Sequence, residues 1–283
     1  MSAMGDSTLE RFAGELEERN RDNVSRTESY LELYAWTRAH PPELPWVLMA
    51  HLVSRNAGYM MTEIATRLPE SPDPSLARMA ENLFLLLERG NFLIFHDAWH
   101  HVTRFLRGGA SSLAAPRTPA FMVEAWRRYE QALTAHGATP EVERALVLDL
   151  VHNEQHFIEQ RVVHHADYVP GAGLLALVEA GGREKPLVFP CAAASGEPEI
   201  RVGEFASLPR RIEAGRRIFD EVVRDRARRD AMFAWAMAHP HTGSRAVYGG
   251  RLGPGVREAW PVERVRGLLA AIHDPPAPDP SYP

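Results

Sequence analysis

Three Ser-Arg pairs in this 283-residue chain carry the side chains best suited to holding an anionic ligand. They are Ser25-Arg26, Ser54-Arg55 and Ser244-Arg245, and each lies near an expected helix end, where backbone N–H groups are free. An arginine fork beside such donors suits a carboxylate or a phosphate. We therefore expect a small anionic ligand. The expected ligand-binding residues are Arg26, His51, Arg55, Asn56, Asn91, Ser244 and Arg245.

Carboxyl groups and one imidazole would give the same cleft acid–base chemistry. The carboxyl groups would act as general acids or bases, and His241 would carry protons. The expected catalytic residues are Glu88, Asp97, Glu154, Glu159 and His241. The alternative is a buried structural network, because paired arginines and glutamates also tie helices together without any turnover.

A histidine-carboxylate face has the spacing of a metal site. Asp149, His152, His156 and Glu159 follow i, i+3, i+7 and i+10, which places all four on one side of a helix. Neither this helix nor the one around residues 96–101 contains the Glu-x-x-His pair of di-metal bundles, and HNEQH lacks the His-Glu-x-x-His order of zinc proteases. With 13 histidines, such pairs also arise by chance. We therefore assign no metal, favour a half-buried polar face, and leave the cofactor open.

Charge and cysteine content narrow the class of protein. The net charge of −5 provides no positive field for nucleic acid or an anionic membrane, and the arginines between residues 210 and 229 alternate with acids like a solvated helix face. The longest apolar runs, such as residues 83–87, are far shorter than the roughly 20 residues that cross a bilayer. A single cysteine and a start without an export signal favour a soluble, cytoplasmic protein. The oligomeric state is left open.

Start and stop signals indicate the helices that would position these side chains. Ser7 and Ser25 each precede a glutamate at capping-box spacing, and Thr118 and Thr139 each precede a proline. The helix before Pro41 must end by His40, and the next one, from Trp46, is expected to give way near Gly58. About 25 residues after Pro140 have an unbroken helical period, long enough for the central helix of the fold.

These signals predict an all-α, single multi-helix globular domain of about nine or ten helices over residues 7–273. A subdivision into core helices 7–166 and C-terminal helices 207–273 is left open. A Gly/Pro-rich connection, 167–206, would join the two, with at most a short strand near 187–189. One continuous helix is expected from Pro209 to about Ala238, and the tail 274–283 is expected to be disordered.

Five groups of residues occur in a fixed order across most of the chain. They are Ser25-Arg26-Thr27 with Tyr30; residues 50–56 with Met61-Thr62-Glu63; Glu88-Arg89-Gly90-Asn91 through Phe95 with Asp97-Ala98; Asn153-Glu154-Gln155 with Ile158-Glu159; and residues 241–245 with Tyr248. Together they resemble a bacterial family catalogued as domain of unknown function 2515. The resemblance implies a helical fold and no particular activity.

The function expected from the residues is therefore broad. The leading hypothesis is a small-molecule-handling protein with a polar Arg/Glu/His cleft, and whether it is an enzyme is left open. The alternative is a non-catalytic helical interaction or scaffold protein with a buried charged network. The two differ in geometry, because an enzyme gathers these side chains around one solvent-reachable pocket and a scaffold seals them in pairs.

Overall fold

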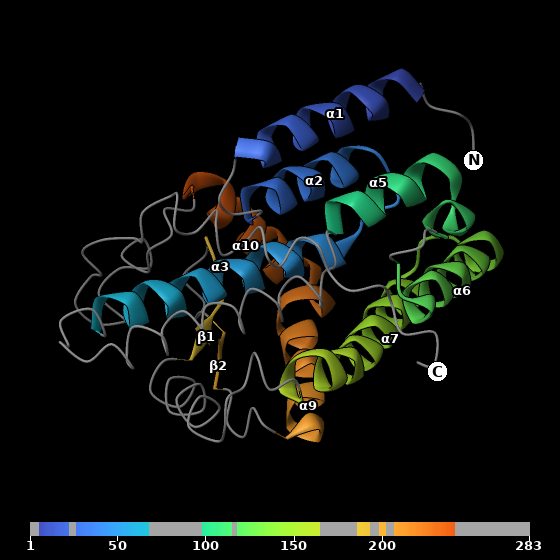
Figure 1. The fold of residues 1–283 in the computed structure, drawn as a ribbon. Coiled ribbons are helices and arrows are strands. Elements are labelled where there is room, and N and C mark those ends of the chain that lie inside the picture. The colour runs from blue at the N-terminus through green and yellow to red at the C-terminus, as the bar shows by residue number, and fades with distance from the viewer. Residues whose placement is uncertain are drawn as a thin grey trace.

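The computed structural model describes residues 6–22, 27–67, 98–114, 118–164, 186–192, 198–201 and 207–240 (Figure 1). These residues are mostly helical, and the sheet found among them is a single pair of two-residue strands. The predicted all-α class is confirmed, and the strand expected near 187–189 is present as Leu187–Val188. The tail 274–283 and the last expected helix lie outside the described residues, and the single-domain boundaries stay a prediction.

The elements follow one another in a simple order. The described α-helices are α1 (Asp6–Asp22), α2 (Thr27–Ala39), α3 (Pro45–Arg67), α5 (Ala98–Gly108), α6 (Ala120–His136), α7 (Pro140–Ile158), α9 (Leu208–Phe219) and α10 (Arg226–Ala238). A 3-10 turn, η1 (Ala110–Leu113), follows α5, and the π-helical segments η2 (Glu159–Val163) and η3 (Asp220–Arg224) follow α7 and α9. The strands β1 (Leu187–Val188) and β2 (Glu199–Ile200) pair antiparallel.

Helix ends agree with some of the local signals and not with others. Thr139 caps α7 by accepting a hydrogen bond from the Val142 N–H at 3.3 Å, and α2 ends at Ala39, before the two prolines. The predicted cap at Thr118 is wrong, because Pro119 takes the cap position and Thr118 is buried. Ser7 is likewise no cap, since α1 already begins at Asp6. Ser25 lies outside the described residues.

Two predicted helix boundaries are also wrong. α3 continues through Gly58 to Arg67, because a helical glycine costs only about 1 kcal/mol and the packing of the first half of α3 outweighs that cost. The helix expected from Pro209 to Ala238 is interrupted at Asp225, which has extended backbone. The Asp225 carboxylate accepts hydrogen bonds from the N–H groups of Ala227 and Arg228 and so starts α10 anew.

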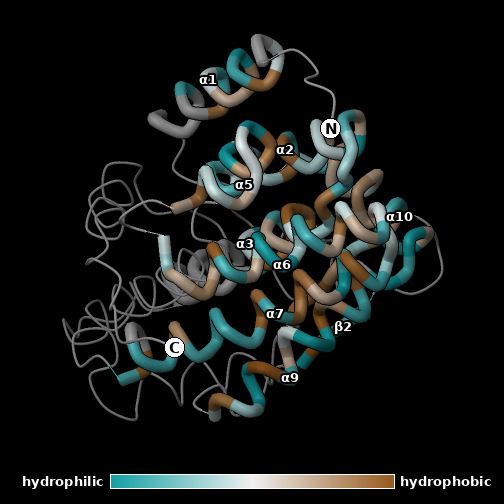
Figure 2. Tube along the Cα trace, turned by 90° about the vertical axis from the view of Figure 1, so that its right-hand side faces the viewer, coloured by the Kyte–Doolittle hydropathy of each residue, from teal (hydrophilic) through white to brown (hydrophobic). Residues whose placement is uncertain are grey.

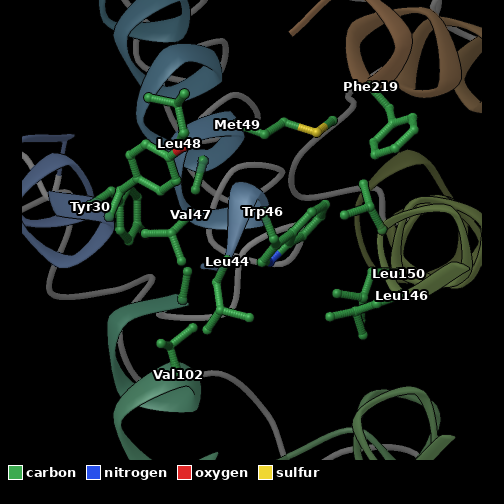
Figure 3. Close-up of a cluster of buried hydrophobic side chains, with 14 of the residues drawn as sticks. Tyr30, Leu44, Trp46, Val47, Leu48, Met49, Val102, Leu146, Leu150 and Phe219 are labelled. Carbon is green, nitrogen blue, oxygen red and sulfur yellow. The ribbon is translucent and has the colours of Figure 1, made fainter. Parts of the chain in front are cut away.

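The first half of α3 is the longest continuously buried segment among the described residues, and a central place for the helix that starts at Pro140 stays a prediction. Every residue from 44 to 52 is buried, whereas α7 exposes one side to solvent. Trp46 and Met49 of α3 face Leu150 of α7 and Phe219 of α9 in the core (Figure 3). Burying each large apolar side chain of this kind contributes about 1.5 to 3 kcal/mol.

Helices α6, α7 and α9 pack side by side below α3 (Figure 1). Both α7 and α9 alternate brown and teal residues along their length, as helices with one buried side do (Figure 2). Gly215 allows α9 to lie close to α7: a Cβ at this position would be only 2.5 Å from Cγ1 of Val151. Among the described residues, no helix is long and apolar enough to cross a membrane.

Candidate functional site

Three of the expected ligand-binding residues lie completely buried on α3. His51, Arg55 and Asn56 each have 0% of their surface exposed, because this part of α3 is covered by neighbouring elements on all sides. His51 donates a hydrogen bond from Nδ1 to the Thr27 carbonyl oxygen over 2.6 Å. The bond holds the ring against the first residue of α2 and places the remaining ring nitrogen, Nε2, as an acceptor when the imidazole is neutral.

Asn56 uses its amide group to hold the first strand. Its Nδ2 donates to the carbonyl oxygens of Leu52 at 2.9 Å and Val188 at 3.0 Å. Its Oδ1 accepts the Val188 N–H at 3.0 Å. Both amide protons are therefore used, and Asn56 behaves like a backbone unit that extends the ladder of β1 onto α3.

Arg55 lies one turn after His51 and reaches α10. Its guanidinium carbon is 4.5 Å from the centre of the Trp235 ring, which is within cation–π distance. The ring of His239 stacks on Trp235, nearly parallel to it, with the ring centroids 4.5 Å apart. The buried charge of Arg55 is thus stabilised in part by an aromatic surface.

Glu154 is the more unusual of the two expected catalytic residues that the structure describes. It lies on the core side of α7, in line with Leu146 and Leu150 and one turn before Phe157 and Ile158, where the helical period calls for an apolar residue. It is 0% exposed, and within the described part of the chain neither carboxyl oxygen makes a hydrogen bond. Burial raises the pKa of Glu154 well above its ordinary value of 4.5.

Glu159 does not share the environment of Glu154. It begins the π-helical segment η2 and forms an ion pair with Arg211, a buried residue in the first turn of α9. Nε2 of His164 lies 3.1 Å from the other carboxylate oxygen of Glu159. Burial lowers the pKa of Arg211 to about 10, which still leaves it charged at neutral pH. Glu159 therefore ties α7 to α9.

The histidine-carboxylate face on α7 is occupied by other contacts. Asp149 forms an ion pair with Arg128 of α6, and it also accepts a hydrogen bond from Asn153 at 2.9 Å. The rings of His152 and His156 pack edge to face with centroids 4.9 Å apart. No group of three or more potential ligand side chains that could hold a metal ion is found among the described residues.

One buried polar cluster was missed in the sequence. The Tyr34 hydroxyl donates to Glu43, in the connection between α2 and α3, and Nε of Arg229 donates to the same oxygen at 3.2 Å. Burial raises the pKa of Tyr34, and the hydrogen bond to Glu43 adds to the shift. The only signal was Arg229 itself, which belongs to the stretch expected to be solvated. That expectation is wrong for Arg211 and Arg229, which are 2% and 6% exposed.

The expected convergence of the arginines and glutamates stays a prediction. Arg55 and Glu154 are both described, and no ion pair joins them. The other members lie outside the described residues: Arg26, Glu88, Asn91, Asp97, His241, Ser244 and Arg245. The ligand-binding and catalytic roles assigned to the whole set remain untested.

Comparison with known proteins assigns the chain to a family. The family described as "Protein of unknown function (DUF2515)" matches residues 18–266, which is most of the chain. The chain belongs to this family. The chain is also similar to the uncharacterized protein YppC of Bacillus subtilis (strain 168), with 31% identity over 166 residues that cover 56% of this chain and 48% of YppC.

The chain thus spans about half the length of the curated relative it matches. No solved structure matches it. The described parts of the DUF2515 segments include residues 50–56 on α3 and 153–159 at the end of α7. The family-like segments therefore contain four of the described polar residues that have no exposed surface, His51, Arg55, Asn56 and Glu154.

Proposed function

We propose that this chain handles a small polar molecule that binds beside Glu154, and that the carboxyl group of Glu154 donates a proton to it and accepts one from it. The supporting observation is a carboxyl group with no exposed surface and, among the described residues, no hydrogen-bonding partner. Such a group costs stability unless something satisfies it, because a polar group is taken from water without compensation. A ligand with an N–H or O–H group would supply the missing partner.

The protonation of Glu154 supports an acid–base role. Burial raises the pKa of Glu154, so the carboxyl group keeps its proton to a higher pH than an exposed glutamate does. General acids in enzymes are tuned in this way. The protonated group can donate from one oxygen and accept at the other, and after the proton has moved to the ligand, both oxygens can accept.

The surroundings of Glu154 also support the proposed acid–base role. The helix that carries it changes to π-helix at Glu159, little more than one turn later, and π-helical insertions are frequent at functional sites. Oε1 of Gln155 is also buried without a hydrogen bond in the described part of the chain. The end of α7 therefore presents several buried oxygen acceptors that the described protein groups leave unsatisfied.

A thermal-shift screen of small polar metabolite-like compounds tests this proposal. A compound that binds the native state raises the melting temperature of the wild type, and Glu154→Gln should lose that shift because glutamine cannot transfer the proton. Glu143→Gln is the matched control, since Glu143 lies on the same helix and burial also raises its pKa. A compound that shifts the wild type and Glu154→Gln equally would contradict the assigned role.

The second candidate is a non-catalytic helical interaction or scaffold protein. The cluster of Tyr34, Glu43 and Arg229 favours it, because there each buried polar group has a partner and the contact joins distant parts of the chain. For this candidate, Glu154→Gln would change stability without changing the binding of any small molecule. The single cysteine fits a reducing compartment, and we propose a cytoplasmic location for the chain under either candidate function.

A further inference from the structure

An open groove of about 550 Å³ runs between α6 and α7 and ends at α9. Its size lies within the range of small-molecule sites. It exists because the facing positions carry small side chains: Ala125 and Ala132 lie two turns apart on α6, and Ala145 lies across from them on α7. None of His51, Arg55 and Glu154 lines it, so the groove is separate from the site proposed above.

The rim of the groove is positively charged. Arg216 of α9 is exposed, and its side chain forms no ion pair with any described residue. Arg128 also lines the groove, but Asp149 neutralises it. His152 stands exposed on the same side, one turn after Asp149. The uncompensated cation on this rim, among the described residues, is thus Arg216, and the imidazole of His152 in the same lining can add a hydrogen bond.

Tyr129, whose hydroxyl group is buried, also lines the groove. Tyr129 is 3% exposed, its ring packs on Phe105 and Trp126, and its Oη makes no hydrogen bond within the described part of the chain. Burial raises the pKa of Tyr129, and the charge of Glu143 raises it further, so the hydroxyl stays a neutral donor. Tyr129 therefore adds no charge to the lining of the groove.

We infer that this groove binds a small amphipathic carboxylate, with the carboxylate group at Arg216 and His152 and an aliphatic body over the alanines of α6 and α7. Charge complementarity selects the anion, because Arg216 lacks a partner among the described residues and a cationic head group would be repelled. The apolar floor selects a ligand with a hydrocarbon part, since burying that part releases water from both surfaces. A polyanion would need more uncompensated cations than this rim has.

Isothermal titration calorimetry with octanoate tests the inference, with octylammonium as the charge-reversed probe. Octanoate should bind saturably and octylammonium should not. Arg216→Gln should weaken octanoate binding about tenfold, which corresponds to losing one partly exposed ion pair. Arg217→Gln is the matched control, because Arg217 is exposed on the same helix but does not line the groove. This variant should bind octanoate with the affinity of the wild type.

Two further variants make the outcome decisive. Ala145→Trp places a large side chain in the groove at an exposed position that tolerates it, and it should abolish binding while circular dichroism stays unchanged. Glu154→Gln should leave octanoate binding intact, so the two proposed sites can fail separately. Equal binding of octanoate and octylammonium, unchanged binding in Arg216→Gln, or a dimer that buries the groove would each overturn the inference.

Discussion

At the scale of single residues, Glu154 should make the stability of the protein depend on pH. Its pKa is raised in the folded state, so above pH 4.5 the folded chain binds more protons than the unfolded chain, and stability falls as pH rises toward the folded pKa. Glu154→Gln removes this loss. As pH rises, the free energy of unfolding of the variant should therefore increase relative to that of the wild type by up to about 1.4 kcal/mol per pH unit.

Urea denaturation of both proteins at pH 5, 6 and 7 measures that difference. The control is Glu124→Gln, in which an exposed carboxylate is lost whose pKa is lowered by its hydrogen bond to Arg127. Here the sign is reversed and the pH window lies lower, because a lowered pKa makes the wild type gain stability over the variant only as pH rises to about 4.5, so this difference should stay flat between pH 5 and 7. A flat difference for Glu154→Gln would mean that the carboxyl group is satisfied in solution.

At the scale of helices, the contact between α7 and α9 depends on the absence of a side chain at Gly215. Gly215→Ala would place a Cβ 2.5 Å from Val151, so we expect a loss of about 1 to 3 kcal/mol in the free energy of unfolding. Gly14→Ala is the control, because nothing lies within 4 Å of its Cβ position in α1. That change should stabilise the protein by about 0.5 to 1 kcal/mol. Adding Val151→Ala should restore most of the loss in Gly215→Ala.

At the scale of helices, some helix ends and contacts can be predicted from the sequence and others cannot. The cap at Thr139 and the stop before Pro41 follow from neighbours in sequence, because their hydrogen bonds and clashes are local. The caps predicted from the same kind of signal at Ser7 and Thr118 are wrong. The continuation of α3 through Gly58 depends on packing around residues 44–52, which only the folded chain supplies. Glu154 was an expected catalytic residue, and its apolar neighbours on α7 also indicate its burial, whereas the partners of Arg211 and Arg229 could not be predicted.

At the scale of the whole molecule, the Glu43–Arg229 contact joins the start of α3 to α10. Arg229→Met leaves the Glu43 carboxylate, which also holds Tyr34, with a missing partner in a largely buried position. We expect a loss of about 3 to 5 kcal/mol in the free energy of unfolding. Arg228→Met removes only an exposed pair with Glu221 and should cost within about 0.5 kcal/mol. Chemical denaturation of the two neighbouring variants compares them directly, and equal losses would show that the Glu43 pair is no more than a surface contact.

The hydrogen bonds between Asn56 and Val188 also set an order of events in folding. They join residues 132 positions apart, so a long loop must close before β1 has anything to pair with on α3. Contacts of this separation form slowly, and we expect the helical core to assemble first and β1 to dock last. In pulse-labelling hydrogen exchange, the Val188 amide should gain protection later than the amides of α7. In the Asn56→Ala variant, the Val188 amide should exchange at nearly the rate of an unfolded chain, while the amides of the helices stay protected.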